Sequence, residues 1–182
     1  MKIFATLLVC GLLTSCKYQE IADAPYPDQV IYMPAAVRGI YDISVVVDTY
    51  NNPTPGSPTR YSIDSTGNKV IVPLAVYRAG VSNDGTFSVN IAINPDTVGT
   101  LITDGTLNGV ELLPANQYNI PSSIVVNAGK ESASFDLDIK LDFLQANIGK
   151  VYAVAVEISS SERAVNPLYK TTIVLINTSI LE

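Results

Sequence analysis

The chain has 182 residues, with 17 acidic and 11 basic side chains, and a formal net charge of −6 at pH 7. This acidic balance argues against nucleic acid as a partner, because binding to phosphates requires clustered positive charge. The sequence contains no histidine, which removes the commonest general base and the usual histidine-containing triads. The length suits one hydrophobic core and is short for two large ones.

Residues 1–15 have the pattern of a secretory signal peptide. Lys2 precedes an apolar run at 3–13, which is too short to cross a bilayer, and small residues follow it. Leu13 stands three residues before Cys16, an arrangement that is similar to the signal of bacterial lipoproteins. This resemblance implies that Cys16 becomes the first residue of the mature protein and carries lipid. The alternative is a buried N-terminal helix with an incidental cysteine.

A lipid on Cys16 would make the membrane a partner, because each buried methylene contributes about 0.8 kcal/mol and two chains give stable attachment. We therefore expect a protein anchored to a membrane by lipid. The resemblance to surface lipoproteins described below implies the outer membrane and exposure at the cell surface, with the periplasmic face as the alternative. Residues 16–29 contain Pro25 and Pro27 and show no sustained periodicity, which predicts a tether.

From residue 30 to residue 182 the dominant pattern is the period of two that is typical of β-strands. The alternating runs are 43–47, 87–93 and 133–143. In the last run, Phe135 and Leu137 are expected to face the core, with Asp136 and Asp138 facing solvent. Strands that hide one face and wet the other are accommodated by two antiparallel sheets packed face to face.

Two further runs, 70–78 and 151–159, are apolar on both faces and suit central strands, although Pro73 cannot donate to a ladder and belongs at an edge or bulge. A last strand is expected at 172–177. Short helical turns are expected near 96–103 and 143–148. The sequence therefore predicts a single all-β domain over 30–182, an immunoglobulin-like antiparallel β-sandwich.

The turn Asn83-Asp84-Gly85, just before the run at 87–93, predicts a β-hairpin. Glycine adopts the positive φ that such turns need at no steric cost.

A set of short motifs occurs in a recurring order: Leu113-Pro114, then Tyr118, then the long alternating strand, then an apolar strand that begins near Tyr152. This order resembles the adhesin-like N-terminal domain of Bacteroidales surface lipoproteins, a family of domains of unknown function. The resemblance covers residues 30–177. In that family the domain usually precedes a family 18 glycosidase, a discoidin-like module or a laminin-G-like module. The resemblance therefore implies glycan capture at the outer membrane, and it assigns no functional residues.

The sequence does not predict an enzyme, a metal site or a cofactor. Asp136 and Asp138 would project from one face of a strand about 7 Å apart, which is compatible with glycosidase chemistry. Lys140 continues that face, however, and a solvated strand explains all three side chains. Calcium would need further oxygen ligands beside Asp136, Asp138 and Asp142, and zinc or iron would lack histidine and thiol ligands.

The segment 50–68 is the candidate binding loop. It contains three prolines that stiffen it, flanked by Tyr50 and Tyr61. Long loops on a rigid sandwich often carry binding residues, and tyrosine rings can lie against the apolar face of a sugar. The alternative for Tyr50 and Tyr61 is a structural role at the base of the loop.

These features predict a non-catalytic surface lipoprotein that acts as an adhesin-like binding module, with extracellular glycan as the candidate ligand. The alternative is a structural or pilin-like subunit that docks to other surface proteins or assembles with them by strand exchange. Val37-Arg38-Gly39 would then be the site of proteolytic trimming.

Overall fold

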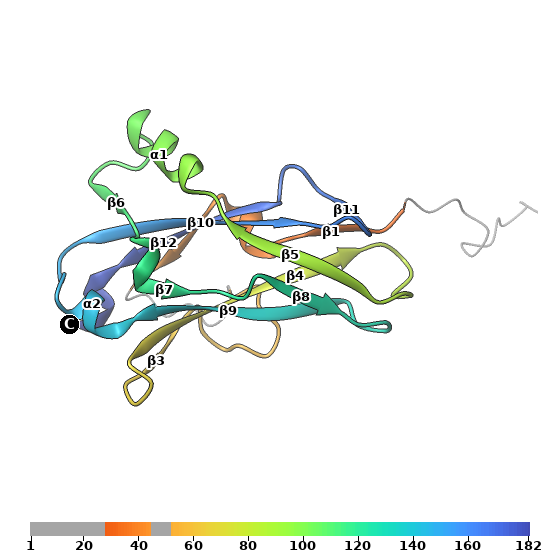
Figure 1. Cartoon of the computed structure of the whole chain (residues 1–182), viewed down its shortest axis with the longest axis horizontal. Helices are drawn as coiled ribbons and strands as arrows, with labels where there is room; N and C mark the ends of the chain where they lie inside the picture. Colours follow the sequence, from red (N-terminus) through yellow and green to blue (C-terminus); the bar gives the residue numbers. More distant parts are fainter. Residues whose placement is uncertain (1–27, 45–51) are drawn as a thin grey trace, which may run out of the picture.

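The computed structural model describes residues 28–44 and 52–182. These residues form two six-stranded sheets, which lie face to face in Figure 1. The structure therefore confirms an all-β sandwich. Cys16, Tyr50 and the proposed signal peptide lie outside the described residues. No helix in the described part of the chain is long and apolar enough to span a membrane.

The first sheet is built on one long antiparallel pair. Its strands are β1 (Val30–Tyr32), β3 (Ser62–Asp64), β4 (Lys69–Ala79), β7 (Tyr118–Asn119), β9 (Ser132–Lys140) and β11 (Ala164–Val165). Their order is β11-β1-β4-β9-β7, and β3 also pairs with β4. The β4–β9 ladder runs from the pair Lys69 and Lys140 to the pair Tyr77 and Ser132. The β1–β11 pair is parallel.

The second sheet has the order β2-β12-β10-β5-β8, and β6 also pairs with β10. Its strands are β2 (Ile40–Ile43), β5 (Phe87–Ile93), β6 (Val110–Leu112), β8 (Ser123–Val126), β10 (Val151–Ser159) and β12 (Thr171–Asn177). The pairs β2–β12 and β6–β10 are parallel. The N-terminal segment changes sheets at the 3-10 helix η2 (Pro34–Arg38), so β1 and β2 belong to different sheets.

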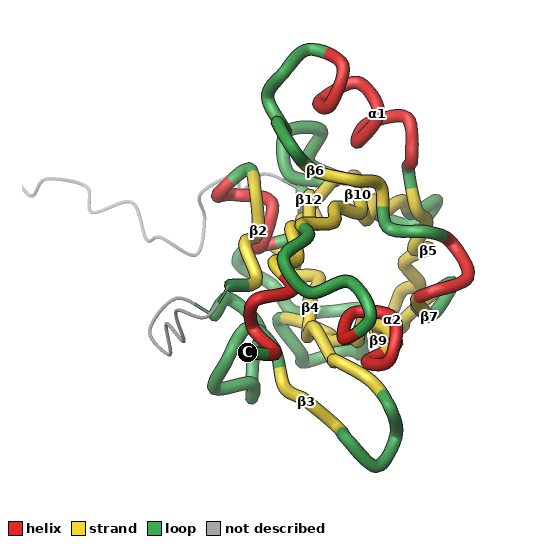
Figure 2. The backbone as a smooth tube through the Cα atoms, turned by 90° about the vertical axis from the view of Figure 1, so that its left-hand side faces the viewer, coloured by secondary structure: helices red, strands yellow, loops and turns green. Residues whose placement is uncertain are grey.

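The hydrophobic core lies between the two sheets, and alternation along the strands fills it. In β9, Phe135 and Leu137 are buried while Asp136 is exposed, which confirms the predicted face. Figure 2 looks along the sandwich, with strands on all sides of the space that these side chains fill. The largest fully buried side chains include Tyr41, Phe87, Ile31, Met33, Ile43 and Leu74.

The strand β10 is buried on both faces because a helix covers its outer face. That helix, α1 (Pro95–Thr103), places Val98 against Ala153 and Ala155 in a second, smaller apolar cluster. Alanine side chains are short, so the helix can approach the sheet closely. Figure 1 shows α1 outside the sandwich, on the side of β10 and β12. Residues 151–159 are therefore apolar on both faces because the sheet core covers one face and α1 covers the other.

Pro73 lies in β4 where one edge of the strand has no neighbouring strand. On that edge β3 pairs with residues up to Ile71, and β1 begins to pair at Tyr77. The buried Thr54 Oγ1 donates to the Pro73 carbonyl oxygen at 2.9 Å. The loop that contains Thr54 therefore covers this edge of β4, where Pro73 has no N–H group for pairing with another strand.

Two local predictions are wrong. The turn at Asn83-Asp84-Gly85 does not close a hairpin, because β4 and β5 belong to different sheets and the turn joins them. The alternating run also stops early: β9 ends at Lys140, and the short helix α2 (Leu141–Gln145) follows. Asn68 receives the Leu141 N–H on its carbonyl at 3.0 Å, which turns the chain out of the sheet.

We expect Phe135→Ala to lower the free energy of unfolding by about 3–5 kcal/mol, because it leaves a cavity between the sheets. Asp136→Ala should change it by less than about 0.5 kcal/mol, since that side chain is exposed. Denaturant unfolding of both variants measures the difference. The reverse ranking would show that the two faces of β9 are inverted.

Candidate functional site

Two adjoining hollows lie where α1 and β6 meet the segment that leads to β7. The first has a volume of about 290 Å³ and an apolar lining that includes Leu112, Leu113, Pro114 and Tyr118. The second, of about 610 Å³, runs along α1. Pro95 and Leu112 line both hollows, so the hollows adjoin at these two residues. We name the pair of hollows the α1–Tyr118 groove.

The start of α1 is fixed on the second sheet by a chain of hydrogen bonds. Asn94 is the N-cap residue, and its Oδ1 accepts from the Thr97 N–H at 3.2 Å. Its Nδ2 donates to Glu157 Oε2 at 2.8 Å, and its backbone N–H donates to the Ala155 carbonyl at 2.9 Å. One side chain thus caps the helix and ties it to β10.

The apolar half of the groove is built where the chain crosses between the sheets. Leu113 is buried, and its N–H donates to the Ala153 carbonyl at 2.9 Å. Pro114 then leads into a 3-10 turn, and Tyr118 pairs with Ile139 in the first sheet. Tyr118 is half-buried, and burial raises the pKa of its phenol. The hydroxyl group therefore remains protonated and can donate or accept a hydrogen bond.

The half of the groove along α1 presents oxygen atoms. The Thr100 and Thr103 hydroxyl groups donate to the carbonyls of Asp96 and Gly99, at 2.9 and 2.8 Å, and their oxygen atoms can still accept a hydrogen bond. The Thr106 N–H donates to Asp104 Oδ1 at 2.9 Å, which lowers the pKa of this carboxyl. None of the described residues that line the groove is basic.

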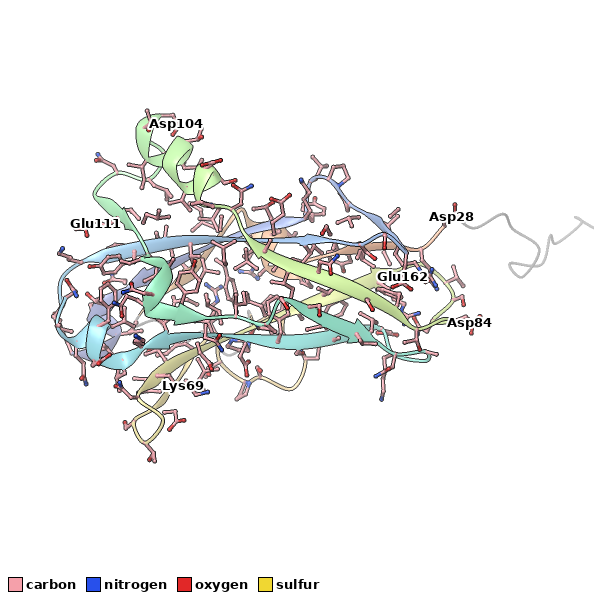
Figure 3. All side chains as sticks on the ribbon, viewed as in Figure 1. Asp28, Lys69, Asp84, Asp104, Glu111 and Glu162 are labelled. Carbon is pink, nitrogen blue, oxygen red and sulfur yellow. The ribbon has the colours of Figure 1, made fainter. Side chains whose placement is uncertain are left out.

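A third hollow, of about 470 Å³, lies at the opposite end of the sandwich and involves Asp28, Asp84, Glu162 and Arg163. Figure 3 labels its three acidic residues at that end, away from Asp104 and Glu111. Two of these carboxylates have local partners: Glu162 Oε1 accepts from the Ser88 N–H at 2.9 Å, and Asp84 Oδ2 accepts from the Ser82 hydroxyl group at 2.6 Å. Within 28–44 and 52–182, no group of acidic residues is arranged to hold a metal ion.

Asp136 and Asp138, the two carboxylates that the sequence analysis considered for catalysis, lie on the outer face of β9. Asp138 Oδ2 accepts from Lys69 Nζ at 2.8 Å across the β4–β9 pair, and this bond raises the pKa of Lys69. Asp136 is exposed on the same face. This arrangement is that of a solvated strand.

Of the two predicted binding tyrosines, only Tyr61 lies in the described residues, where it is half-buried against the core. The loop before it is tied to the sheet: Tyr41 donates its hydroxyl hydrogen to Asn52 Oδ1 at 2.9 Å, and Asn52 Nδ2 donates to the Ser57 carbonyl at 2.8 Å. Tyr61 itself packs against the core, and its binding role stays a prediction. The groove does not include it. The sequence identified three residues of the groove only as parts of the family motif and predicted no binding role for them: Leu113, Pro114 and Tyr118.

The fold and groove define a two-sheet immunoglobulin-like module with an open surface site. The model of the family described as "-like, N-terminal domain" matches residues 26–165. The chain belongs to this family of N-terminal domains, which confirms the resemblance seen in the sequence. None of the curated proteins matches the chain.

Several solved structures share the fold. A Bacteroides ovatus protein described as a candidate carbohydrate-binding protein matches with a TM-score of 0.57 and 13% identity, over 81% of this chain and 36% of that one. A second Bacteroides ovatus protein, of unknown function, has a TM-score of 0.52 and 20% identity, over 81% and 44%. A two-domain protein from Bacteroides fragilis has a TM-score of 0.50 and 14% identity, over 82% and 45%. The chain thus spans less than half the length of each.

The cap of α1 gives a pH-dependent contribution to stability. Hydrogen bonds from Lys170 and then from Asn94 lower the pKa of Glu157 below its ordinary value of 4.5. A carboxyl with a lowered pKa stabilises the fold above that ordinary value, and the contribution is lost as the pH falls through the lowered one. Glu157→Gln should therefore lose less stability than the wild type between neutral pH and pH about 3. Thermal unfolding across that range measures this, and equal losses would contradict it.

Proposed function

We propose that this domain is a non-catalytic, adhesin-like binding module, held at the outer membrane by a lipid on Cys16, which captures extracellular glycan in the α1–Tyr118 groove. The observation that carries the proposal is the composition of the groove, in which an apolar hollow adjoins a row of oxygen acceptors. A sugar ring has the matching surface, with an apolar C–H face and a rim of hydroxyl groups.

The position of the groove supports capture outside the cell. Asp28, the first described residue, belongs to the last part of the proposed tether and lies at the end of the sandwich opposite α1 (Figure 3). A lipid at Cys16 would hold that end toward the membrane, so the groove would point outward. The fold shared with the Bacteroides ovatus protein described as a candidate carbohydrate-binding protein is consistent with this use.

The acidic residues of the groove lie at opposite ends of α1: Asp96 is in its first turn and Asp104 is its C-cap residue. The hydrogen bond from the Thr106 N–H lowers the pKa of Asp104, whereas glycoside hydrolysis uses one carboxyl with a raised pKa as the general acid. These features favour binding without cleavage.

The alternative, a pilin-like subunit that exchanges strands, is favoured by one observation. β1 lies between β4 and β11, and the exposed residues 37–39 follow it at the end of η2. Proteolysis after Arg38 would cut β1 from the rest of the domain, and its release would leave the facing edges of β4 and β11 open to a strand from another molecule.

We expect Cys16→Ser to abolish membrane attachment, because the residue that carries the lipid is lost. Fractionation of cells, followed by a carbonate wash of the membranes, measures the attached share. The wild type should stay with the membranes and the variant should not. Retention of the variant after the wash would contradict the lipid anchor.

We expect Tyr118→Ala to weaken glycan retention about tenfold, the loss that corresponds to about 1.4 kcal/mol of binding free energy. The intrinsic site is expected to be weak, with a Kd on the order of 0.1–1 mM, and many anchored copies would supply avidity. Affinity electrophoresis on a panel of polysaccharides compares the wild type with Tyr118→Ala and with Tyr61→Ala, the matched tyrosine outside the groove.

The unfolding midpoint of each variant is measured first, so that a loss of folding is not read as a loss of binding. Loss of retention with Tyr61→Ala alone would move the site to the proline-rich loop, where Tyr50→Ala is then tested. Equal retention of all three proteins would remove both tyrosines from the site. If the wild type is retained on no glycan, the alternative with a protein partner is favoured.

A further inference from the structure

We infer that the ligand of the α1–Tyr118 groove is a neutral oligosaccharide of two or more linked sugars, with one sugar on the apolar hollow and the next along α1. This inference rests on the proposed function and adds the charge and the length of the ligand. It follows from two properties of the groove: the sign of its charges and its division into two unlike halves.

The charges of the groove disfavour acidic sugars. Asp96 and Asp104 line the half along α1, and none of the described lining residues in either half is a lysine or arginine. The bond from the Thr106 N–H to Asp104 favours the charged form of this carboxyl. A uronate or sulfate group would approach fixed negative charge with no cation to pair with it, which disfavours binding. A neutral chain meets no such cost.

The two halves fit two consecutive units of a chain. The hollow at Tyr118 has about 290 Å³ and an almost wholly apolar lining, which suits the C–H face of one ring. The hollow along α1 has about 610 Å³ and offers Thr100, Thr103 and two carboxylates to hydroxyl groups. They adjoin at Pro95 and Leu112, which line both. A single sugar would fill only one half.

Leu112 is the residue through which the two halves can be tested together. Its side chain is 41% exposed, so a polar substitution there should leave the core intact. Ile63, on β3 and away from the groove, is 44% exposed and provides a matched control. For charge, Asp104→Asn keeps the oxygen that accepts from Thr106 and removes the negative charge. Asp136→Asn makes the same change on the outer face of β9.

The test is calorimetric titration with neutral gluco- and manno-oligosaccharides, from the single sugar upward, beside uronate oligosaccharides of equal length. We expect affinity for a neutral series to rise about tenfold from the single sugar to the disaccharide or trisaccharide. Uronate chains should bind at least about tenfold more weakly. Leu112→Asp should abolish the gain with length and Ile63→Asp should keep it. Asp104→Asn should improve uronate binding, whereas Asp136→Asn should not.

Each other outcome has a separate meaning. Affinity that does not change with chain length, or uronates bound as tightly as neutral chains, would overturn this inference and leave glycan binding in place. A gain with length that survives Leu112→Asp would place the ligand outside the groove. If the wild type binds no glycan in either this titration or the polysaccharide panel, the proposed function itself is rejected.

Discussion

The burial of both faces of β10 is the constraint on which the rest of the structure depends. Its inner face contributes Tyr152 and Val154 to the core between the sheets, and its outer face presents Ala153 and Ala155 to α1. β6 pairs with the same strand. The helix and β6 thus lie side by side because both pack on β10, and together with the segment that leads to Tyr118 they line the groove. Packing around β10 therefore positions most of the candidate site.

The strands whose position follows from their apolar pattern were predicted correctly from the sequence. The alternation at 133–140 correctly gave the strand and the buried face of β9, and the apolar run at 151–159 gave the bounds of β10. The failures have local causes. Turn residues show that the chain reverses, but not whether the next strand joins the same sheet, so Asn83-Asp84-Gly85 was misread as a hairpin. Leu141 and Leu144 fit the start of a helix as well as the end of a strand.

The candidate site was harder to predict because its residues have ordinary structural explanations. Leu113 and Pro114 carry the change of sheet, and Tyr118 pairs in β7. In the sequence, Leu112 and Leu113 are simply two adjacent apolar residues. Only the three-dimensional arrangement shows that Leu113 is buried whereas Leu112 is exposed and lines both hollows. The prolines at 53–58 indicated a binding loop. In the structure, Thr54 of that loop donates a hydrogen bond to the Pro73 carbonyl, so the loop packs against the edge of β4.

The place of β1 has a mechanical consequence. The strand follows directly after the first described residues, and it is held along its length by β4 on one side and β11 on the other. Beyond its end, the Met33 N–H donates to the Tyr169 carbonyl at 2.9 Å. If the proposed lipid anchor and a ligand in the proposed groove pulled on the domain from opposite ends, the force would act along this strand. Its hydrogen bonds would then bear the load in shear and would have to break together, so the domain should resist tension better than one whose terminal strand can be peeled away bond by bond.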